Sequence, residues 1–236
     1  MALAGLGCIS VLSAAQADEM FTTINRSVYL EGRLGTPIPI NHDVTTTSNV
    51  AAANGTIDTH FRHGIAGAAS VGAYLMTNVR GEVEASIIHS QSPSMNFNTG
   101  FAGNPFQNKK LDANGTVDAF SMMFNGIYDF SMLKFYGITP FAGAGIGFTH
   151  LRVDSLAPGN ARFIPSDSDT VIGGQIIAGL DYPLNETFTL TGRYALGITG
   201  GASFRGTDTA NAGGTLTAST DTMLNHIFTV GLRLKL

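Results

Sequence analysis

Residues 229–236 read TVGLRLKL, and apolar and polar side chains alternate along this stretch without a break. In an extended strand one face carries only aliphatic side chains, those of Val230, Leu232, Leu234 and Leu236. The opposite face carries Thr229, Gly231, Arg233 and Lys235. A frayed chain end is normally polar and irregular. The stretch therefore predicts a strand whose aliphatic face is covered by a protein core or by lipid.

The composition favours lipid and excludes some classes of partner. Charged residues make up 13% of the chain, against about 25% in an ordinary soluble domain. The formal net charge of −4 argues against nucleic acid, because phosphate binding needs a basic face. Beyond the N-terminus there is no apolar run of about 18 residues, the length of a spanning helix. If the protein crosses a membrane, we expect it to do so with strands.

The N-terminus predicts a signal peptide over residues 1–17. Small and apolar residues run from Leu3 to Ala15, and Ala15-Gln16-Ala17 fits the A-x-A cleavage rule. An ordinary buried first helix is one alternative, and lipoprotein processing at Cys8 is another. Cys8 is the single cysteine of the chain, so a mature protein over residues 18–236 has no disulfide.

The mature chain shows a period of two in eight successive segments, and the helical period is almost absent. The segments span residues 27–35, 61–76, 79–90, 116–130, 135–153, 170–184, 187–197 and 223–236. The connections between them alternate in length. Short turns such as Thr77-Asn78 alternate with long polar loops, expected at 36–60, 90–114, 154–168 and 199–221. This pattern predicts an all-β fold: an eight-stranded antiparallel transmembrane β-barrel with short periplasmic turns and long extracellular loops.

Charged residues of both signs recur on the face opposite the aliphatic row. They are Glu31, Arg33, Arg80, Glu82, Glu84, Arg193 and Arg233. The interior of an eight-stranded barrel is just wide enough to be filled by side chains, so these charges can neutralise one another there. On the lipid side, an Arg or Lys at the midplane would cost about 2–4 kcal/mol. We therefore expect an interior charge cluster, with a soluble lipocalin-like barrel or sandwich as the alternative. Closure predicts that the last strand pairs with residues 27–35.

Four motifs give the chain a resemblance to the OmpA-like and opacity-type outer-membrane barrels. They are VRGEVEAS (79–86), FNGIYDF (124–130), ITPFAGAGIGF (138–148) and the terminal TVGLRLKL. The resemblance implies integral location in the outer membrane of a Gram-negative bacterium, in contact with its lipid and lipopolysaccharide. It also implies that Thr229, Gly231, Leu234 and Leu236 form a signal for the barrel-assembly machinery. The family usually ends in Phe, whereas this chain ends in Leu236.

Candidate catalytic and metal residues are sparse, and we expect no catalytic site, cofactor or metal. Lipid A deacylase barrels use a His-x-Ser pair, but His150 is followed by Leu151 and Arg152. His89 and Ser90 are adjacent, so they face opposite sides of a strand. A metal site at Asp58, His60 and His63 would likewise divide its ligands between the two faces of a strand. The glycines at 143, 145 and 147 do not make a phosphate loop, because no helix and no Lys-Ser/Thr follow them.

The leading functional prediction is a non-catalytic, surface-exposed outer-membrane protein whose loops are available for adhesion or immune contact. The alternative is a small gated porin-like channel, and a third hypothesis is an enzyme that modifies lipid A. Lys109-Lys110 could contact anionic lipopolysaccharide or a host ligand, although such pairs are commonly just solvated.

Overall fold

The computed structural model describes residues 28–40, 42–48, 54–60, 64–91, 94–100, 110–112, 114–157, 166–208 and 214–236. The expected signal peptide and Cys8 lie outside these ranges. Within them, no helix is long and apolar enough to span a membrane.

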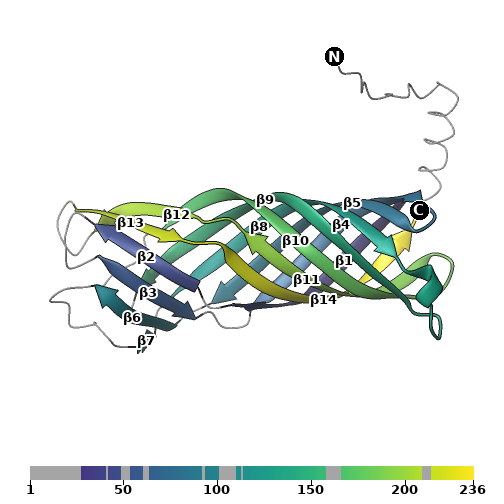
Figure 1. The fold of residues 1–236 in the computed structure, drawn as a ribbon, viewed down its shortest axis with the longest axis horizontal. Helices are drawn as coiled ribbons and strands as arrows, with labels where there is room; N and C mark the ends of the chain where they lie inside the picture. The colour runs from purple at the N-terminus through teal and green to yellow at the C-terminus, as the bar shows by residue number, and fades with distance from the viewer. Residues whose placement is uncertain are drawn as a thin grey trace, which may run out of the picture.

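Eight strands form a closed barrel, as the eight alternating segments predicted (Figure 1). In chain order they are β1 (Val28–Pro39), β4 (Ile65–Met76), β5 (Val79–Gln91), β8 (Asn114–Asp129), β9 (Thr139–Ala157), β10 (Asp167–Pro183), β11 (Phe188–Thr199) and β14 (Met223–Lys235). Each pairs antiparallel with its two neighbours, in the order β1-β14-β11-β10-β9-β8-β5-β4. Closure pairs the terminal strand β14 with β1, with Glu31 opposite Arg233 and Leu34 opposite Val230. The predicted partner of TVGLRLKL is confirmed, and closure leaves no free sheet edge in the barrel.

Short turns join the strands at one end of the barrel, which we call the turn end. Thr77 and Asn78 form the predicted turn between β4 and β5, and the 3₁₀ turn η2 (Ser131–Leu133) follows β8. The strand expected to begin at Phe135 begins instead at Thr139. Tyr136 and Gly137 both have positive φ, 48° and 85°, and they reverse the chain between Phe135 and Ile138.

The glycines of β9 allow it to lie close against β8 on the inside of the barrel. A Cβ atom at Gly147 would overlap the backbone carbonyl oxygen of Met122, and one at Gly143 would overlap that of Gly126. At Gly145 it would overlap the side-chain amide of Asn125. Glycine is required at these three positions, because atoms of β8 already occupy the space that a Cβ atom would need.

Gly147→Ala is therefore expected to lower the free energy of unfolding by about 1–3 kcal/mol, the usual cost of overpacking. Gly126→Ala is the matched control, because Gly126 has open space around its Cα. The control is expected to be neutral or to stabilise by up to about 1 kcal/mol. Urea unfolding in lipid vesicles measures both. Equal stability of the two variants would contradict the proposed role of the close approach.

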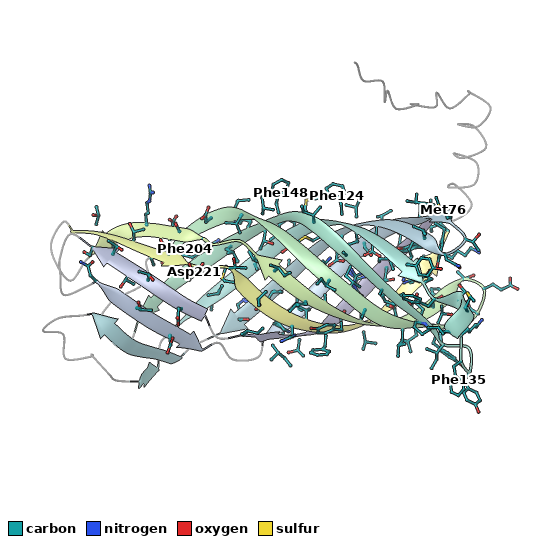
Figure 2. All side chains as sticks on the ribbon, viewed as in Figure 1. Met76, Phe124, Phe135, Phe148, Phe204 and Asp221 are labelled. Carbon is teal, nitrogen blue, oxygen red and sulfur yellow. The ribbon has the colours of Figure 1, made fainter. Side chains whose placement is uncertain are left out.

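The outer wall of the barrel is a belt of exposed apolar side chains. Figure 2 shows Phe124 and Phe148 projecting from the wall, and their side chains are 61% and 58% exposed. Further members are Leu34, Val71, Ile87, Ile146, Ile172, Ile176 and Val230. Soluble monomers rarely expose an apolar patch of more than a few hundred Å². The belt therefore needs an apolar solvent, which is what a transmembrane barrel has.

The long connections contain a second sheet, and the expectation that they are plain loops is wrong. Its strands are β2 (His42–Ser48), β3 (Gly55–His60), β6 (Ser94–Gly100), β7 (Lys110–Asp112), β12 (Ser203–Asp208) and β13 (Gly214–Thr220). They pair in the order β12-β13-β2-β3-β6-β7 at the end of the molecule opposite the turns (Figure 1). We call this sheet the platform. Its strands are short and rich in Thr, which favours strands but gives little apolar periodicity to detect.

The platform packs on the ends of the barrel strands through an apolar core. Val44, Ile57 and Phe204 of the platform meet Leu151 and Val153 of β9, and all five are buried. Val117, Ala119, Val171 and Met223 pack against this core from the barrel side. Figure 2 shows Phe204 where the platform joins the barrel. An apolar core thus joins the platform to the ends of the barrel strands.

Candidate functional site

The structure places all seven charged residues of the expected interior cluster on the inner face of the barrel. They are Glu31, Arg33, Arg80, Glu82, Glu84, Arg193 and Arg233, none more than 5% exposed. Alternation along each strand puts them there, since their neighbours in sequence face outward. Lys235, which shares their face of β14, is exposed at the turn end.

The half of the cluster nearer the turn end is organised around Asp181. Arg233 lies 2.7 Å from Asp181 and 2.7 Å from Glu31. Arg80 lies 3.2 Å from Asp181 and 3.1 Å from Asp129. One carboxylate on β10 thus holds two guanidinium groups that come from β5 and β14.

The other half is organised around Glu84. Arg193 lies 2.8 Å from Glu84 and 2.8 Å from Glu82. Arg33 lies 2.9 Å from Glu84 and also pairs with Glu31. Because Arg33 and Arg233 share Glu31, the two halves form one network across the lumen.

Neutral groups complete this network. The Tyr29 hydroxyl donates to Glu82 at 3.0 Å, and the Asn125 amide donates to Glu82 and Glu84 at 3.0 Å each. The Gln175 amide donates to the side-chain oxygen Oδ1 of Asn125 at 2.8 Å. Aromatic faces cover two of the cations, with Arg80 4.7 Å from the ring centre of Phe141 and Arg233 4.8 Å from that of Tyr29. We call the charged residues and these partners the polar network.

Asp129 and Asp181 were missed as members of the cluster. Both lie at the turn end of their strands, where the sequence resembles the start of a turn, yet both residues are only 6% exposed. Asp181 occupies the inward position of β10, and that alternation is the signal that identifies it. With these two, four arginines face five carboxylates.

The polar network is a buried set of ion pairs inside the barrel, and its role in the fold follows from how its charges are compensated. Each carboxylate has an arginine partner, so the charges are compensated where they are buried. Removing one partner of a buried pair is strongly destabilising, because the other charge is left uncompensated. The network therefore fills the interior near the turn end with paired charges, and its charged residues come from β1, β5, β8, β10, β11 and β14.

The residues of the expected assembly signal lie on β14. Thr229 and Gly231 are on its inner face, and a Cβ atom at Gly231 would overlap the carbonyl oxygen of Gly32. Leu234 faces outward, and Leu236, at the chain end, is 61% exposed. Recognition of these residues by assembly machinery remains a prediction.

The candidate catalytic residues lie apart from the polar network. His89 is on the outer wall, where it pairs with Asp118, whereas Ser90 is buried on the inner face. His150 is on the outer wall and contacts the Thr170 hydroxyl at 2.9 Å.

The remaining candidates fall largely on undescribed residues. His63 and Lys109 lie outside the described ranges, and only the backbone is described for His60 and Lys110. Among the described residues, no group of three His, Cys, Asp or Glu is placed to hold a metal ion.

Carboxylates fasten the platform edge to the barrel. The backbone N–H of Ser203 donates to Asp169 at 2.9 Å, and that of Arg205 donates to Asp167 at 2.8 Å. These bonds occupy backbone donors of β12, the strand at one edge of the platform, with side chains of β10. An edge strand with unpaired donors invites pairing with another chain, so the carboxylates protect this edge.

A second carboxylate pair lies across β2 and β3, where Asp43 is directly opposite Asp58. The hydrogen bond with Asp58, slight burial and the charges of Asp58 and Asp221 raise the pKa of the Asp43 carboxyl. A pKa raised in the folded state means that the fold binds this proton more tightly than the unfolded chain. The resulting stabilisation is present at acidic pH and is lost as pH rises through the folded pKa.

A family model described as the outer membrane protein beta-barrel domain matches residues 1–235. The crystal structure of Neisserial surface protein A is similar at 16% identity and a TM-score of 0.50, over 89% of this chain and 97% of that one. The outer membrane protein OprG from Pseudomonas aeruginosa is similar at 14% identity and a TM-score of 0.59, also over 89% and 97%. At these identities the likeness concerns the fold alone. No curated protein sequence matches the chain.

Proposed function

This chain belongs to the outer membrane protein beta-barrel domain family, and from that premise we propose that it is a non-catalytic surface protein that acts through its platform. As an outer-membrane barrel of a Gram-negative bacterium, it has its short turns in the periplasm and its long connections outside the cell. The platform is built from those long connections. It is the part of the protein that a ligand outside the cell meets first.

The observation that carries the proposal is the folded state of the platform. Six paired strands and a buried apolar core stabilise it. A rigid surface loses little entropy on binding, which favours contact with a partner. Adhesion to a host or cell surface, or immune contact, is the role that we assign to it.

The polar network supports a closed barrel over the channel alternative. Four arginines and five carboxylates meet across the lumen of an eight-stranded barrel, which has little interior space beyond its side chains. An ion entering from the periplasm would have to separate buried ion pairs. We therefore expect the purified protein to give no single-channel steps in planar bilayers.

The test compares adhesion of cells that display the wild-type protein with adhesion of cells displaying Ile57→Asp. Ile57 is fully buried in the platform core, so a carboxylate there is expected to unfold the platform while the barrel survives. Leu133→Asp is the control, since Leu133 is 63% exposed in η2 at the periplasmic end. Heat-dependent gel mobility verifies that each barrel is closed.

We expect cells with the wild-type protein or Leu133→Asp to attach to epithelial monolayers, and cells with Ile57→Asp to attach no better than cells lacking the protein. Equal attachment by the two variants would contradict a role for the platform. Attachment that requires the barrel alone would point to contact through lipid or lipopolysaccharide instead.

A further inference from the structure

A cavity lies inside the barrel, between the polar network and the apolar core under the platform. Its walls come from β5, β8, β9, β10, β11 and β14. Gln175 of the polar network marks its inner end, and Leu151 and Met223, which belong to or pack against the apolar core, mark its outer end. The cavity is thus partly open, and it lies between the ion pairs of the polar network and the apolar core at the platform.

The cavity wall is largely apolar, unlike the layer beneath it. The apolar side chains that line it are Ile88, Val117, Ala119, Met123, Leu151, Met223 and Ile227. Each occupies an inward position of its strand, where a water-filled lumen would favour polar residues. None of the described residues that line the cavity is Asp, Glu, His, Lys or Arg.

Seven polar side chains line the cavity, Ser86, Ser90, Ser121, Thr149, Gln175, Thr199 and Asn225. Ser121, Thr149 and Gln175 of this set are engaged in hydrogen bonds. The hydroxyls of Ser121 and Thr149 are hydrogen-bonded at 2.9 Å. The Gln175 amide donates to Asn125 at 2.8 Å, so it is directed into the polar network. Buried water normally needs two to four polar partners. Because Ser121, Thr149 and Gln175 already make hydrogen bonds, a water molecule beside them would lose hydrogen bonds that it makes in bulk solvent.

The size of the cavity suits a small molecule. Its volume is about 90 Å³, several times the roughly 30 Å³ that one water occupies in the liquid. An apolar cavity of about 150 Å³ lined by Leu, Ile and Phe stays dry and binds benzene. The present cavity is of the same order and has softer walls, since Met123 and Met223 are flexible and adapt to a guest.

We propose that this cavity binds one small apolar molecule, of the size of a monocyclic aromatic hydrocarbon. The apolar side chains supply the contact surface, and the two methionines supply sulfur–aromatic contacts. Asn225 and Thr199 line the same cavity and can accept a single hydroxyl substituent on the ring. An ion has no binding site here, because the charges of the polar network are paired with one another beneath the cavity.

The test uses toluene as the probe and the methionine methyl groups as reporters, by NMR of the full protein in lipid nanodiscs. Met123 and Met223 line the cavity, whereas Met122 faces outward and is 46% exposed on the lipid side. Met122 therefore reports toluene that has merely dissolved in the lipid. We expect the Met123 and Met223 signals to shift and saturate as toluene is added, while Met122 changes in proportion to the toluene content without saturating.

A pair of variants separates cavity binding from lipid partition. Ala119→Leu fills the cavity and is expected to abolish the saturable shift of Met123 and Met223. Ala85→Leu adds the same atoms on the outward face of β5, where Ala85 lines a surface groove with Leu30 and Val83, and it is expected to leave the shift intact. Gel mobility with and without heating shows that both variants fold.

Three outcomes would overturn the proposal. They are an equal, unsaturable response of all three methionines, no response of Met123 and Met223, and a saturable shift that survives Ala119→Leu. The second outcome would mean that water fills the cavity and resists displacement.

Discussion

Arg193→Met is expected to lower the free energy of unfolding of the barrel by about 3–5 kcal/mol, the cost of breaking a buried ion pair from one side. Arg193 lies 2.8 Å from both Glu82 and Glu84, and its side chain is almost fully buried. Methionine preserves much of the volume of the arginine side chain but removes its charge and its N–H donors. Glu82 and Glu84 must then share the hydrogen-bond donors that remain. Arg33 and Asn125 stay within reach of Glu84, but neither can supply the missing charge to both carboxylates.

The chain has no tryptophan, so urea unfolding is best followed by circular dichroism and by the fraction of protein that keeps its heat-sensitive gel mobility. Arg152→Met is the matched control. Arg152 also faces a carboxylate, Asp154 at 3.8 Å, but on the outer wall with more than half of each side chain exposed. An exposed pair of this kind is worth at most about 1 kcal/mol. Similar losses in the two variants would mean that the polar network does not stabilise the barrel.

A rescue variant distinguishes lost charge balance from lost packing. Adding Glu82→Gln and Glu84→Gln to Arg193→Met removes the two carboxylates that the first change leaves without their cation. Replacing a whole buried ion-pair group by neutral residues is often close to neutral in stability. We therefore expect the triple variant to recover most of the loss. If packing alone mattered, the triple variant would be no more stable than Arg193→Met.

The barrel could be predicted from the sequence because a single rule acts along every strand. Each inward residue alternates with one that faces lipid, and a slip by one residue would put Arg80 or Glu82 into the bilayer. The same rule placed the charges of β1, β5, β11 and β14 in one lumen. The partner of each charge could not be predicted, because partnership depends on the stagger of strands far apart in sequence. Arg193 and Glu82, for example, meet across 111 positions.

The platform was missed because its strands have little periodicity of their own. Among the side chains that the structure describes, β2, β3 and β12 each bury a single large apolar one, Val44, Ile57 and Phe204. Their burial is created by the barrel strands beneath them, so it depends on tertiary contacts that a local pattern does not contain. The cavity was missed for a related reason, since small residues such as Ala119 and Gly197 form its wall without any local sign that the opposite wall is distant.

Phe124→Arg is expected to destabilise the barrel by about 2–4 kcal/mol, the cost of an arginine near the bilayer midplane. Phe124 is 61% exposed and projects from the wall (Figure 2), so in a soluble protein the change would cost about 0.5 kcal/mol or less. Phe124 lies directly opposite Ile146 of β9. The outward residues next to it on β8, Met122 and Gly126, are also uncharged. The size of the effect therefore measures the solvent around the barrel.

Thr116→Arg is the control for this change, because it adds the same charge to the same face of the same strand, nearer the platform. Thr116 hydrogen-bonds to Asp154, so a guanidinium there lies beside a carboxylate, above the apolar belt. The two variants differ in how deep the arginine lies in the bilayer. Near the membrane interface the destabilisation by a charge falls to about 0–1 kcal/mol. Refolding into vesicles and urea unfolding measure both variants. If Phe124→Arg were as stable as Thr116→Arg, the apolar belt would be facing protein or water, and the solvent assigned to it would be wrong. If the loss appears only at position 124, the bilayer surrounds the strands and the platform stands outside it.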